Sequence, residues 1–393
     1  SKDVVIMNTI IKDCWGDGIY VAGARISTNI MIDNVVCEAN RRQGISIVYA
    51  DNVTIKNSIM SKTKGAAPQA GIDIEPNVGQ YASNIKILNT KFLNNTGPGL
   101  FVFAGTGKVS DVVVRDCVCE GNSHAGINLN GGNPALPERN LMNVRISNVV
   151  IKDNPLIGLY IRKADNVVLD TLSITDSKQR AVEMTFSKNV VLDSIVVQNV
   201  KTEAFYMEGS DEIRIKRAKV LGLSQTSIGW QVKSSAKVDI RSSSLNGGSI
   251  GVDGKDVGQL SINNVVFQGQ IEKGLSFENV SNGIITSNSF ENISKVPIYL
   301  NKSDNNTFKG NVLKNNSFSA NNQFSQITIT NTSKKNLLSE NKAFSSVQSN
   351  KPKHIILFDN STSGNISKDN VFEVGSYITS PLQDDTGGLN QVN

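Results

Sequence analysis

The sequence comprises 393 residues, of which 39% are hydrophobic and 19% are charged. That apolar content is enough for a large core, and length alone would suggest two or three globular domains. The formal net charge of +5 is only mildly basic, and no Lys/Arg-rich run with interleaved aromatics occurs, so we expect no nucleic-acid partner. No apolar stretch approaches the ~18 residues of a membrane span, so we expect no membrane insertion.

One phrase recurs from the start of the chain: Asn or Asp, two apolar residues around a central position, a polar pair, a second apolar run, a turn, and then Gly followed by alternating apolar residues. Such alternation predicts short strands, and Asn, Asp, Gly and Ser mark the corners between them. Three short strands per repeat bury their inward sides only when repeats stack. The sequence therefore predicts an all-β, right-handed parallel β-helix with about 13–15 rungs and three short strands per rung. The recurring phrase begins at Asn29-Ile30-Met31-Ile32, Asn52-Val53-Thr54-Ile55, Asn84-Ile85-Lys86-Ile87 and Asn166-Val167-Val168-Leu169.

The first residues, from Asp3 to Met7, already alternate like a strand, and neither an initiator Met nor a signal peptide precedes them. A solenoid needs a cap on its first rung, because an open edge invites aggregation. We therefore expect N-terminal material before Ser1 in the complete protein.

The third strand of each rung starts with a small residue, at intervals of about 23 to 32 residues. These residues are Gly18, Gly44, Gly71, Gly99, Gly126, Gly158, Ala181, Ala204 and Gly229. The longer rungs carry extra residues at 63–69, 104–107 and 131–137, which we expect to leave the coil as loops. We predict a β-helix over 1–300, with a loop-bearing and catalytic face in 10–210, looser rungs over 301–375, and a polar C-terminal tail over 376–393.

Cys37 and Cys119 fall where Ile11 and Ile151 sit in other rungs, so we interpret them as core residues rather than metal ligands. Corner asparagines recur as well, and stacked Asn side chains form hydrogen bonds from rung to rung. The sequence predicts neither a metal site nor a cofactor, except Ca²⁺ if the protein is a lyase. The recurring corner asparagines are Asn40, Asn95, Asn122 and Asn154.

Residues at the outward positions of the third strand mix aromatic, acidic, Arg and Asn side chains, a composition suited to binding a sugar chain. An ordinary solvated face would favour Ser, Thr, Lys and Asn, whereas two outward Phe on one strand are unusual. The predicted substrate-binding residues are Tyr20, Arg41, Arg42, Phe101, Phe103, His124, Asn128, Asn130, Tyr160 and Arg162.

Asp73 and Glu75 flank Ile74 and project from the same face, about 6 to 7 Å apart at the backbone. This spacing permits the ~6.5–9.5 Å carboxyl separation of an inverting glycosidase, although rotamers that bring the groups to ~5 Å would suit a retaining one. Burial near Phe101 would raise the pKa of one of these two carboxyl groups, which could then act as a general acid. We predict Asp73, Glu75 and Asp17 as catalytic residues, with a structural salt bridge as the alternative for Arg41 and Arg42. A second candidate site comprises Glu183, Glu203, Tyr206 and Glu208.

Three motifs within residues 16–77 resemble bacteriophage tailspike-type β-helix depolymerases of the pectate-lyase-like superfamily. The motifs are Gly16-Asp17-Gly18-Ile19, Arg41-Arg42-Gln43-Gly44-Ile45-Ser46 and Ala70-Gly71-Ile72-Asp73-Ile74-Glu75-Pro76-Asn77. The resemblance implies a homotrimer on the virion tail, outside the cell, that binds and cuts bacterial surface polysaccharide. It also favours Asp73 and Glu75, with Asp17 and Arg42, as the site.

We therefore predict an endo-acting glycoside hydrolase that depolymerises capsular or exopolysaccharide. Two alternatives stay open. One is a polysaccharide lyase acting by β-elimination on a uronic-acid-containing glycan, and the other is a non-catalytic receptor-binding spike or adhesin.

Overall fold

The computed structural model describes residues 1–320, 323–345, 351–373, 377–387 and 389–392. All the regular secondary structure of these residues is β-strand, and the strands pair in parallel, which confirms the predicted fold class. The chain forms two compact units, Ser1–Val200 and Lys201–Asn393, which are described separately below.

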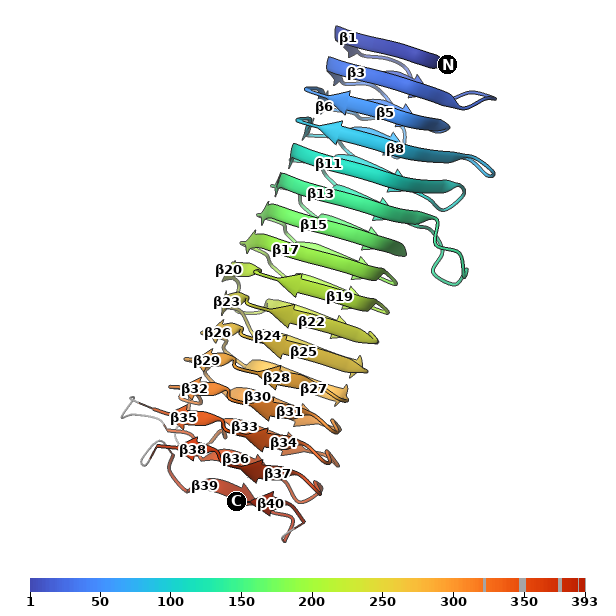
Figure 1. Ribbon diagram of the computed structural model, residues 1–393. Coiled ribbons are helices and arrows are strands. Elements are labelled where there is room, and N and C mark those ends of the chain that lie inside the picture. Colours follow the sequence, from blue (N-terminus) through green and yellow to red (C-terminus); the bar gives the residue numbers. More distant parts are fainter. Residues whose placement is uncertain (321–322, 346–350, 374–376, 388, 393) are drawn as a thin grey trace. The chain divides into compact units, whose positions relative to one another are not determined.

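In the first unit, long strands lie side by side and pair in parallel to form one sheet (Figure 1). Its strands are β1 (Lys2–Lys12), β3 (Ser27–Glu38), β5 (Ala50–Lys56), β6 (Ile59–Ser61), β8 (Tyr81–Leu88), β9 (Lys91–Leu93), β11 (Lys108–Glu120), β13 (Leu141–Lys152), β15 (Ala164–Thr175) and β17 (Lys188–Gln198).

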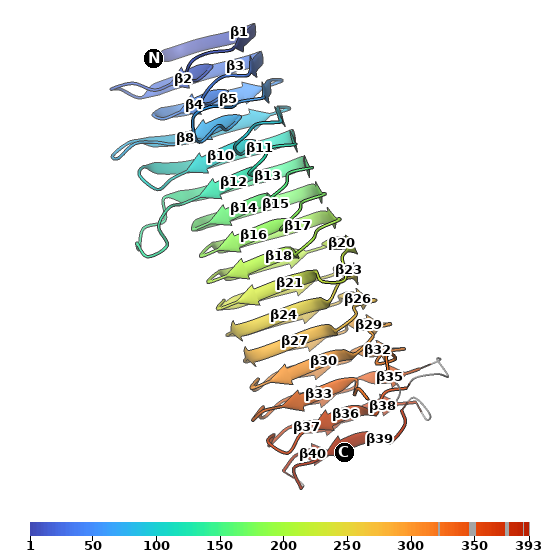
Figure 2. The same ribbon diagram turned by 180° about the vertical axis from the view of Figure 1, so that it is seen from behind.

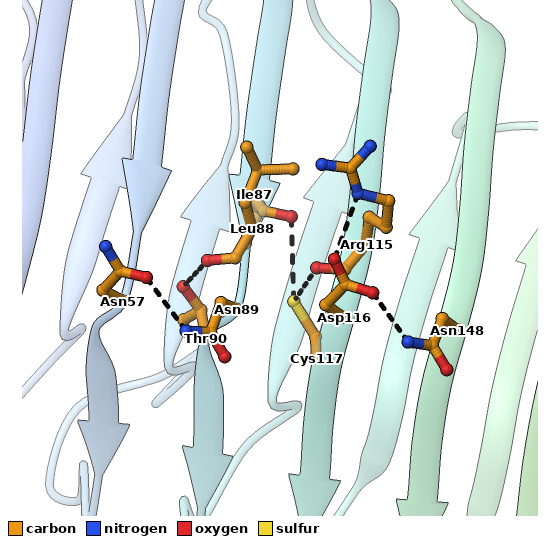
Figure 3. A network of polar contacts seen from close by, with 9 residues as sticks. All are labelled: Asn57, Ile87, Leu88, Asn89, Thr90, Arg115, Asp116, Cys117 and Asn148. Atoms are coloured by element: carbon orange, nitrogen blue, oxygen red, sulfur yellow. Dashed lines mark hydrogen bonds and ion pairs between the residues drawn. The ribbon is translucent and has the colours of Figure 1, made fainter.

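A residue with a left-handed backbone conformation (positive φ) divides each of these long segments in two. Asn34 inside β3 has a φ of 52°, and Asn57 between β5 and β6 has the same value. Asn tolerates this conformation because its short side chain forms local hydrogen bonds. The side chains also bond from rung to rung, since Asn89 Nδ2 donates to Asn57 Oδ1 over 2.9 Å (Figure 3). The predicted three strands per rung are therefore present, with the first two in one sheet.

The third strand of each rung forms the second sheet of this unit, seen from behind in Figure 2. Small residues lead these strands because the backbones approach closely there: a Cβ added at Gly44 would lie 2.4 Å from the carbonyl oxygen of Gly71. The strands are β2 (Ile19–Val21), β4 (Ile45–Ile47), β7 (Ile72–Ile74), β10 (Leu100–Phe103), β12 (Ala125–Asn130), β14 (Ile157–Arg162) and β16 (Val182–Thr185).

Stacked apolar side chains fill the space between the two sheets. Ile45, Ile72 and Leu100 are adjacent in register and fully buried. Cys37 and Cys119 are buried in the same way and form no disulfide, as predicted for core residues. Burial raises the pKa of Cys37 to about 12, so its thiol stays neutral.

Buried asparagines form a ladder at one corner of the coil, as predicted. Asn95 Nδ2 donates to Asn122 Oδ1 over 2.9 Å, and Asn122 Nδ2 donates to Asn154 Oδ1 over 3.3 Å. Asn40 is separated from this ladder, because the intervening rung has Thr63 at that corner and its backbone N–H bonds to Asn95 Oδ1. Asn40 instead accepts from the N–H of Cys14.

The second unit repeats the same arrangement. Its third strands are β18 (Glu203–Glu208), β21 (Ile228–Lys233), β24 (Ile250–Val257), β27 (Lys273–Val280), β30 (Val296–Asn301), β33 (Ile327–Thr330), β36 (His354–Phe358) and β39 (Ser380–Asp384). With seven such strands in the first unit and eight here, the described residues form about fifteen rungs, at the upper end of the predicted range.

The other strands of the second unit are shorter, and they again alternate between two positions along each rung. They are β19 (Asp211–Lys216), β20 (Lys219–Leu223), β22 (Lys237–Arg241), β23 (Ser244–Gly247), β25 (Gln259–Asn263), β26 (Val266–Gln268), β28 (Ile284–Thr286), β29 (Ser289–Glu291), β31 (Thr307–Lys309), β32 (Val312–Lys314), β34 (Leu337–Ser339), β35 (Lys342–Phe344), β37 (Ile366–Lys368), β38 (Val371–Phe372) and β40 (Gln391–Val392).

The segment predicted to be a polar tail contains two strands, β39 and β40. β39 pairs with β36, and β40 pairs with β37, so the coil continues through this region. Its polar composition agrees with the exposure of these strands, because no residue of β39 or β40 is fully buried. The predicted boundary between 375 and 376 lies outside the described residues.

The predicted insertions at 63–69, 104–107 and 131–137 lie outside the strands of the first unit. The segment between β12 and β13 projects from the coil in both ribbon views (Figures 1 and 2). Within the described residues, no helix has the length and apolar character needed to cross a bilayer.

Candidate functional site

The third strands of the first unit place their outward residues in one line, which we call the β2–β16 face. Asp73 pairs with Ser46 on one side and with Phe101 on the other, as the sequence predicted. The period-2 alternation fixes this arrangement, because inward apolar neighbours force the central residue outward. The residues in line are Tyr20, Ser46, Asp73, Phe101, Asn128, Tyr160 and Glu183.

Asp73 is outward-facing yet almost completely covered, with 2% of its surface exposed. Gln43 contributes to this environment: its Nε2 donates to Asp73 Oδ2 over 2.9 Å, and its Oε1 accepts from the N–H of Ala70 over 2.8 Å. The other carboxyl oxygen, Oδ1, is buried and has no hydrogen-bond partner among the described residues.

Burial raises the pKa of Asp73 to about 8, and the nearby charges of Glu75 and Asp17 act in the same direction. The charge of Arg42 and the hydrogen bond from Gln43 oppose the shift but do not overcome it. A carboxyl with this pKa is mostly protonated at neutral pH. Since Oδ2 accepts a hydrogen bond, the proton is better placed on Oδ1.

Asp17 precedes β2, two strands away from the strand of Asp73, and has polar neighbours. Its Oδ2 accepts from the hydroxyl of Ser46 over 2.9 Å and forms an ion pair of 3.3 Å with Arg42. The Asp17 side chain is 8% exposed, whereas that of Arg42 is 41% exposed, so the cation still faces solvent. Arg42 thus forms a salt bridge with Asp17, as in the structural alternative for this residue. Arg42 is also an accessible positive charge at the edge of the face.

Glu75 follows Asp73 on the same side of the chain, just after β7, and is half-buried. Its backbone N–H bonds to the carbonyl of Ile47, which holds the residue in the sheet register. Two residues of strand separate the Cα atoms of Asp73 and Glu75 by about 6 to 7 Å. The structure therefore brings Asp17, Asp73 and Glu75 together on the β2–β16 face.

Aromatic side chains continue the face beyond the carboxyl groups. The rings of Phe101 and Phe103 stack with centroids 5.9 Å apart and planes 23° apart, and both are half-buried. Phe101 also lines a groove of about 320 Å³ together with His124 and Asn128. These three predicted binding residues therefore share one concave surface.

Tyr160 and Arg162 extend the face to β14. Arg162 donates from a guanidinium nitrogen to the Tyr160 hydroxyl over 3.4 Å and from Nε to the carbonyl of Gly132 over the same distance. Asn130 Oδ1 accepts from the N–H of Gly132 over 2.9 Å. Asn130 and Arg162 thus hold the loop after β12 through hydrogen bonds to Gly132. Tyr160 places its aromatic ring on the same face.

At the other end of the face, Trp15 is the most exposed aromatic residue of the described chain, at 82%. The guanidinium of Arg41 lies 4.5 Å from its ring centroid, a cation–π contact. Tyr20, in β2, is 59% exposed. The predicted residues Arg41 and Tyr20 therefore belong to an aromatic and cationic surface at this end.

The second acidic group predicted from the sequence is divided between the two units. In the first unit, Glu183 forms an ion pair of 2.7 Å with Arg180 and is 12% exposed. In the second unit, Glu208 accepts from the Tyr206 hydroxyl over 2.7 Å, and Tyr206 is itself only 7% exposed. Glu203 lies at the start of the same strand, β18.

The described residues contain no group of three or more His, Cys, Asp or Glu side chains placed to hold a metal ion.

Comparison with known proteins identifies the fold family. The sequence profile of the "right handed beta helix region" matches residues 1–142, 139–249 and 203–377. The chain belongs to the right-handed β-helix family. A search of curated protein sequences found no match to this β-helix protein.

Three solved structures with similar folds are as follows. The A-module of mannuronan C-5 epimerase from Azotobacter vinelandii is 13% identical, with a TM-score of 0.49 over 94% of this chain and 91% of that one. DFA-IIIase from Arthrobacter chlorophenolicus is 10% identical, with a TM-score of 0.46 over 91% and 87%. Tailspike protein 3 of bacteriophage CBA120 is 11% identical, with a TM-score of 0.47 over 94% and 56%. At these identities the likeness concerns the fold alone.

Three residues of this β-helix protein's candidate site were absent from the predicted set. Gln43 and Ser46 form hydrogen bonds with the carboxyl groups of Asp73 and Asp17, and Trp15 is the exposed ring beneath Arg41. A Trp between Cys14 and Gly16, just before a third strand, was the available signal, since a large exposed aromatic side chain on a scaffold of this kind is unusual.

Proposed function

We propose that this β-helix protein is a glycoside hydrolase that cuts a polysaccharide bound along the β2–β16 face. The observation that carries the proposal is the environment of Asp73: a buried carboxyl with a pKa of about 8 and a free oxygen, beside a second carboxylate. Two carboxyl groups with different environments are the arrangement that glycoside hydrolysis requires.

In this mechanism, Asp73 acts as the general acid. The Oδ1–H group donates its proton to the glycosidic oxygen while the bond between that oxygen and the anomeric carbon breaks. Glu75, as a carboxylate, takes a proton from the water that attacks the anomeric carbon. Because Oδ1 is buried, substrate entry requires side chains around Asp73 to move.

Asp17 and Arg42 complete the charge arrangement. Arg42 holds Asp17 by an ion pair of 3.3 Å, and Asp17 in turn helps to keep Asp73 protonated. The half-exposed guanidinium also presents donors that match a sugar carboxylate or hydroxyl pair. The aromatic rings of Trp15, Tyr20 and Phe101 supply faces against which sugar rings pack.

The biological setting follows from the resemblance of residues 16–77 to tailspike depolymerases. We propose bacterial capsular or exopolysaccharide as the substrate, a homotrimer as the assembly, and the virion tail, outside the cell, as the location.

The test is incubation of the protein with a panel of purified bacterial capsular polysaccharides, followed by measurement of new reducing ends. Hydrolysis creates reducing ends without an unsaturated sugar. Ultraviolet absorbance from an unsaturated product would instead identify the lyase alternative. Tight binding to one polysaccharide with no new ends would identify a non-catalytic spike.

A further inference from the structure

A groove lies over Phe101, the sheet neighbour of Asp73. It lies between the segment that precedes β7 and the segment that precedes β10, and Phe101 and Asn128 come from neighbouring strands beneath it. Its volume of about 320 Å³ is at the lower end of the range for small-molecule sites, about 300–1,000 Å³, which suits one sugar unit better than an extended chain.

One side of the groove is apolar. Phe101 presents its ring there, backed by Phe103, and Pro68 and Pro98 add further apolar surface. A pyranose ring has a face of C–H groups, which packs against the electron-rich face of an aromatic ring.

The walls of the groove are firmly held. The N–H of Gly97 donates to the carbonyl of Gln69 over 2.9 Å, and a Cβ added at Gly97 would lie only 1.9 Å from the carbonyl oxygen of Pro68. The two segments are therefore packed backbone against backbone, which keeps the site preformed and lowers the entropy cost of binding.

Two side chains that line the groove, Asn128 and Gln69, each have an amide oxygen that is buried without a hydrogen-bond partner among the described residues. Asn128 is only 5% exposed. An unpaired buried acceptor is unfavourable, and a ligand that donates a hydrogen bond to it removes that penalty. Both atoms are acceptors, so they require hydroxyl or N–H donors and disfavour a carboxylate, which has only lone pairs to offer.

We infer that this groove binds a neutral pyranose, with its C–H face on Phe101 and hydroxyl or acetamido N–H groups donating to Asn128 and Gln69. Phe101 pairs with Asp73 in the sheet, so the residue beneath the bound ring lies one strand spacing, about 4.8 Å at the backbone, from the candidate acid. The inference rests on the proposed function and deepens it. The groove is the subsite next to the cleaved bond, and it selects an uncharged sugar there.

Saturation-transfer NMR on the full chain tests the inference with methyl glucoside, methyl galactoside, N-acetylglucosamine and glucuronate as probes. We expect at least one neutral probe to bind the groove, and we expect glucuronate to bind the groove at least about tenfold more weakly than that probe. Phe101→Ala and Asn128→Ala should each abolish the signal, whereas Asn246→Ala, an exposed Asn of β23, should leave it unchanged.

Asp73→Asn separates this inference from the proposed hydrolase. That variant should keep the NMR signal while it loses polysaccharide cleavage. Full cleavage by Asp73→Asn would overturn the assignment of the acid and leave the subsite standing. Binding of glucuronate as tight as that of the neutral probes, binding that survives both groove variants, or no binding of any neutral probe would overturn the subsite.

Discussion

Gln43 Nε2 donates a hydrogen bond of 2.9 Å to Oδ2 of Asp73, across two rungs that are 30 residues apart in the sequence. This contact occupies one carboxyl oxygen and leaves the other, Oδ1, as the place for a proton. Gln43 is itself fixed by the N–H of Ala70. A single amide thus connects a loop to the candidate acid and orients it.

Replacement of Asp73 by Asn should remove the proton donor with little change in shape. We expect kcat for polysaccharide cleavage to fall by about 10²–10⁴, the usual contribution of a general acid, while the affinity for polysaccharide is retained. Reducing-end assays measure the fall in kcat, and binding measurements check that the affinity is retained. Asp239→Asn, a buried Asp of the second unit that pairs with Arg241, is the control and should cleave normally.

The pH dependence of activity should respond to the neighbours of Asp73 with opposite signs. In the parent protein, kcat/KM should decline above a pH of about 8, as the acid loses its proton. Gln43→Ala removes a hydrogen bond that lowers the pKa, so the decline should move to higher pH. Asp17→Asn removes a charge that raises the pKa, so the decline should move to lower pH. Shifts in the same direction for both variants would refute the assignment.

Stability should also depend on the charge state of Asp73. Its pKa is raised from 3.8 to about 8 on folding, so the folded chain keeps a proton that the unfolded chain has lost between these values. The stabilisation linked to this proton is complete below a pH of about 4 and is lost as the pH rises toward about 8. Asp73→Asn lacks this dependence, so its Tm relative to the parent should increase over that window. Parallel Tm curves for the two proteins would contradict the raised pKa.

The asparagine ladder of the first unit should be sensitive to deletion of one member. Asn122 accepts from the N–H and the side chain of Asn95 and donates to the carbonyl of Phe92. Asn122→Ala leaves these buried groups unpaired, which should lower the free energy of unfolding by about 1–3 kcal/mol. Urea unfolding measures the loss. The exposed Asn246→Ala should change stability by less than about 0.5 kcal/mol.

Trp15 should contribute to polysaccharide binding and not to folding, because 82% of its surface is exposed. Trp15→Ala removes the ring beneath Arg41, and we expect affinity for the polysaccharide to weaken by about 0.5–1.5 kcal/mol. Isothermal titration in the cleavage-deficient Asp73→Asn background avoids substrate loss during the measurement. Ile10→Ala, a 69% exposed apolar residue of β1, provides the comparison and should bind normally. An unchanged affinity for Trp15→Ala would remove Trp15 from the binding surface.

The sequence by itself determined the coil and the register of its third strands. Apolar residues on both sides of Asp73, Phe101 and Asn128 admit one inward pattern, and a shift by one residue would expose the core side chains. That is why the line from Tyr20 to Glu183 was predictable without coordinates. Glu75 was placed on the same side by the same alternation.

Only the tertiary structure decided how these residues are covered and paired. Asp73 is the candidate acid because it is buried, accepts a hydrogen bond from Gln43 and lies near other charges. Asp17 has a different environment, because Arg42 and Ser46 contact its carboxylate. Such contacts join residues about one rung apart through side-chain rotamers and loop paths, which strand periodicity does not encode. The stacking of Arg41 on Trp15 and the close approach of Gly97 to Pro68 have the same origin.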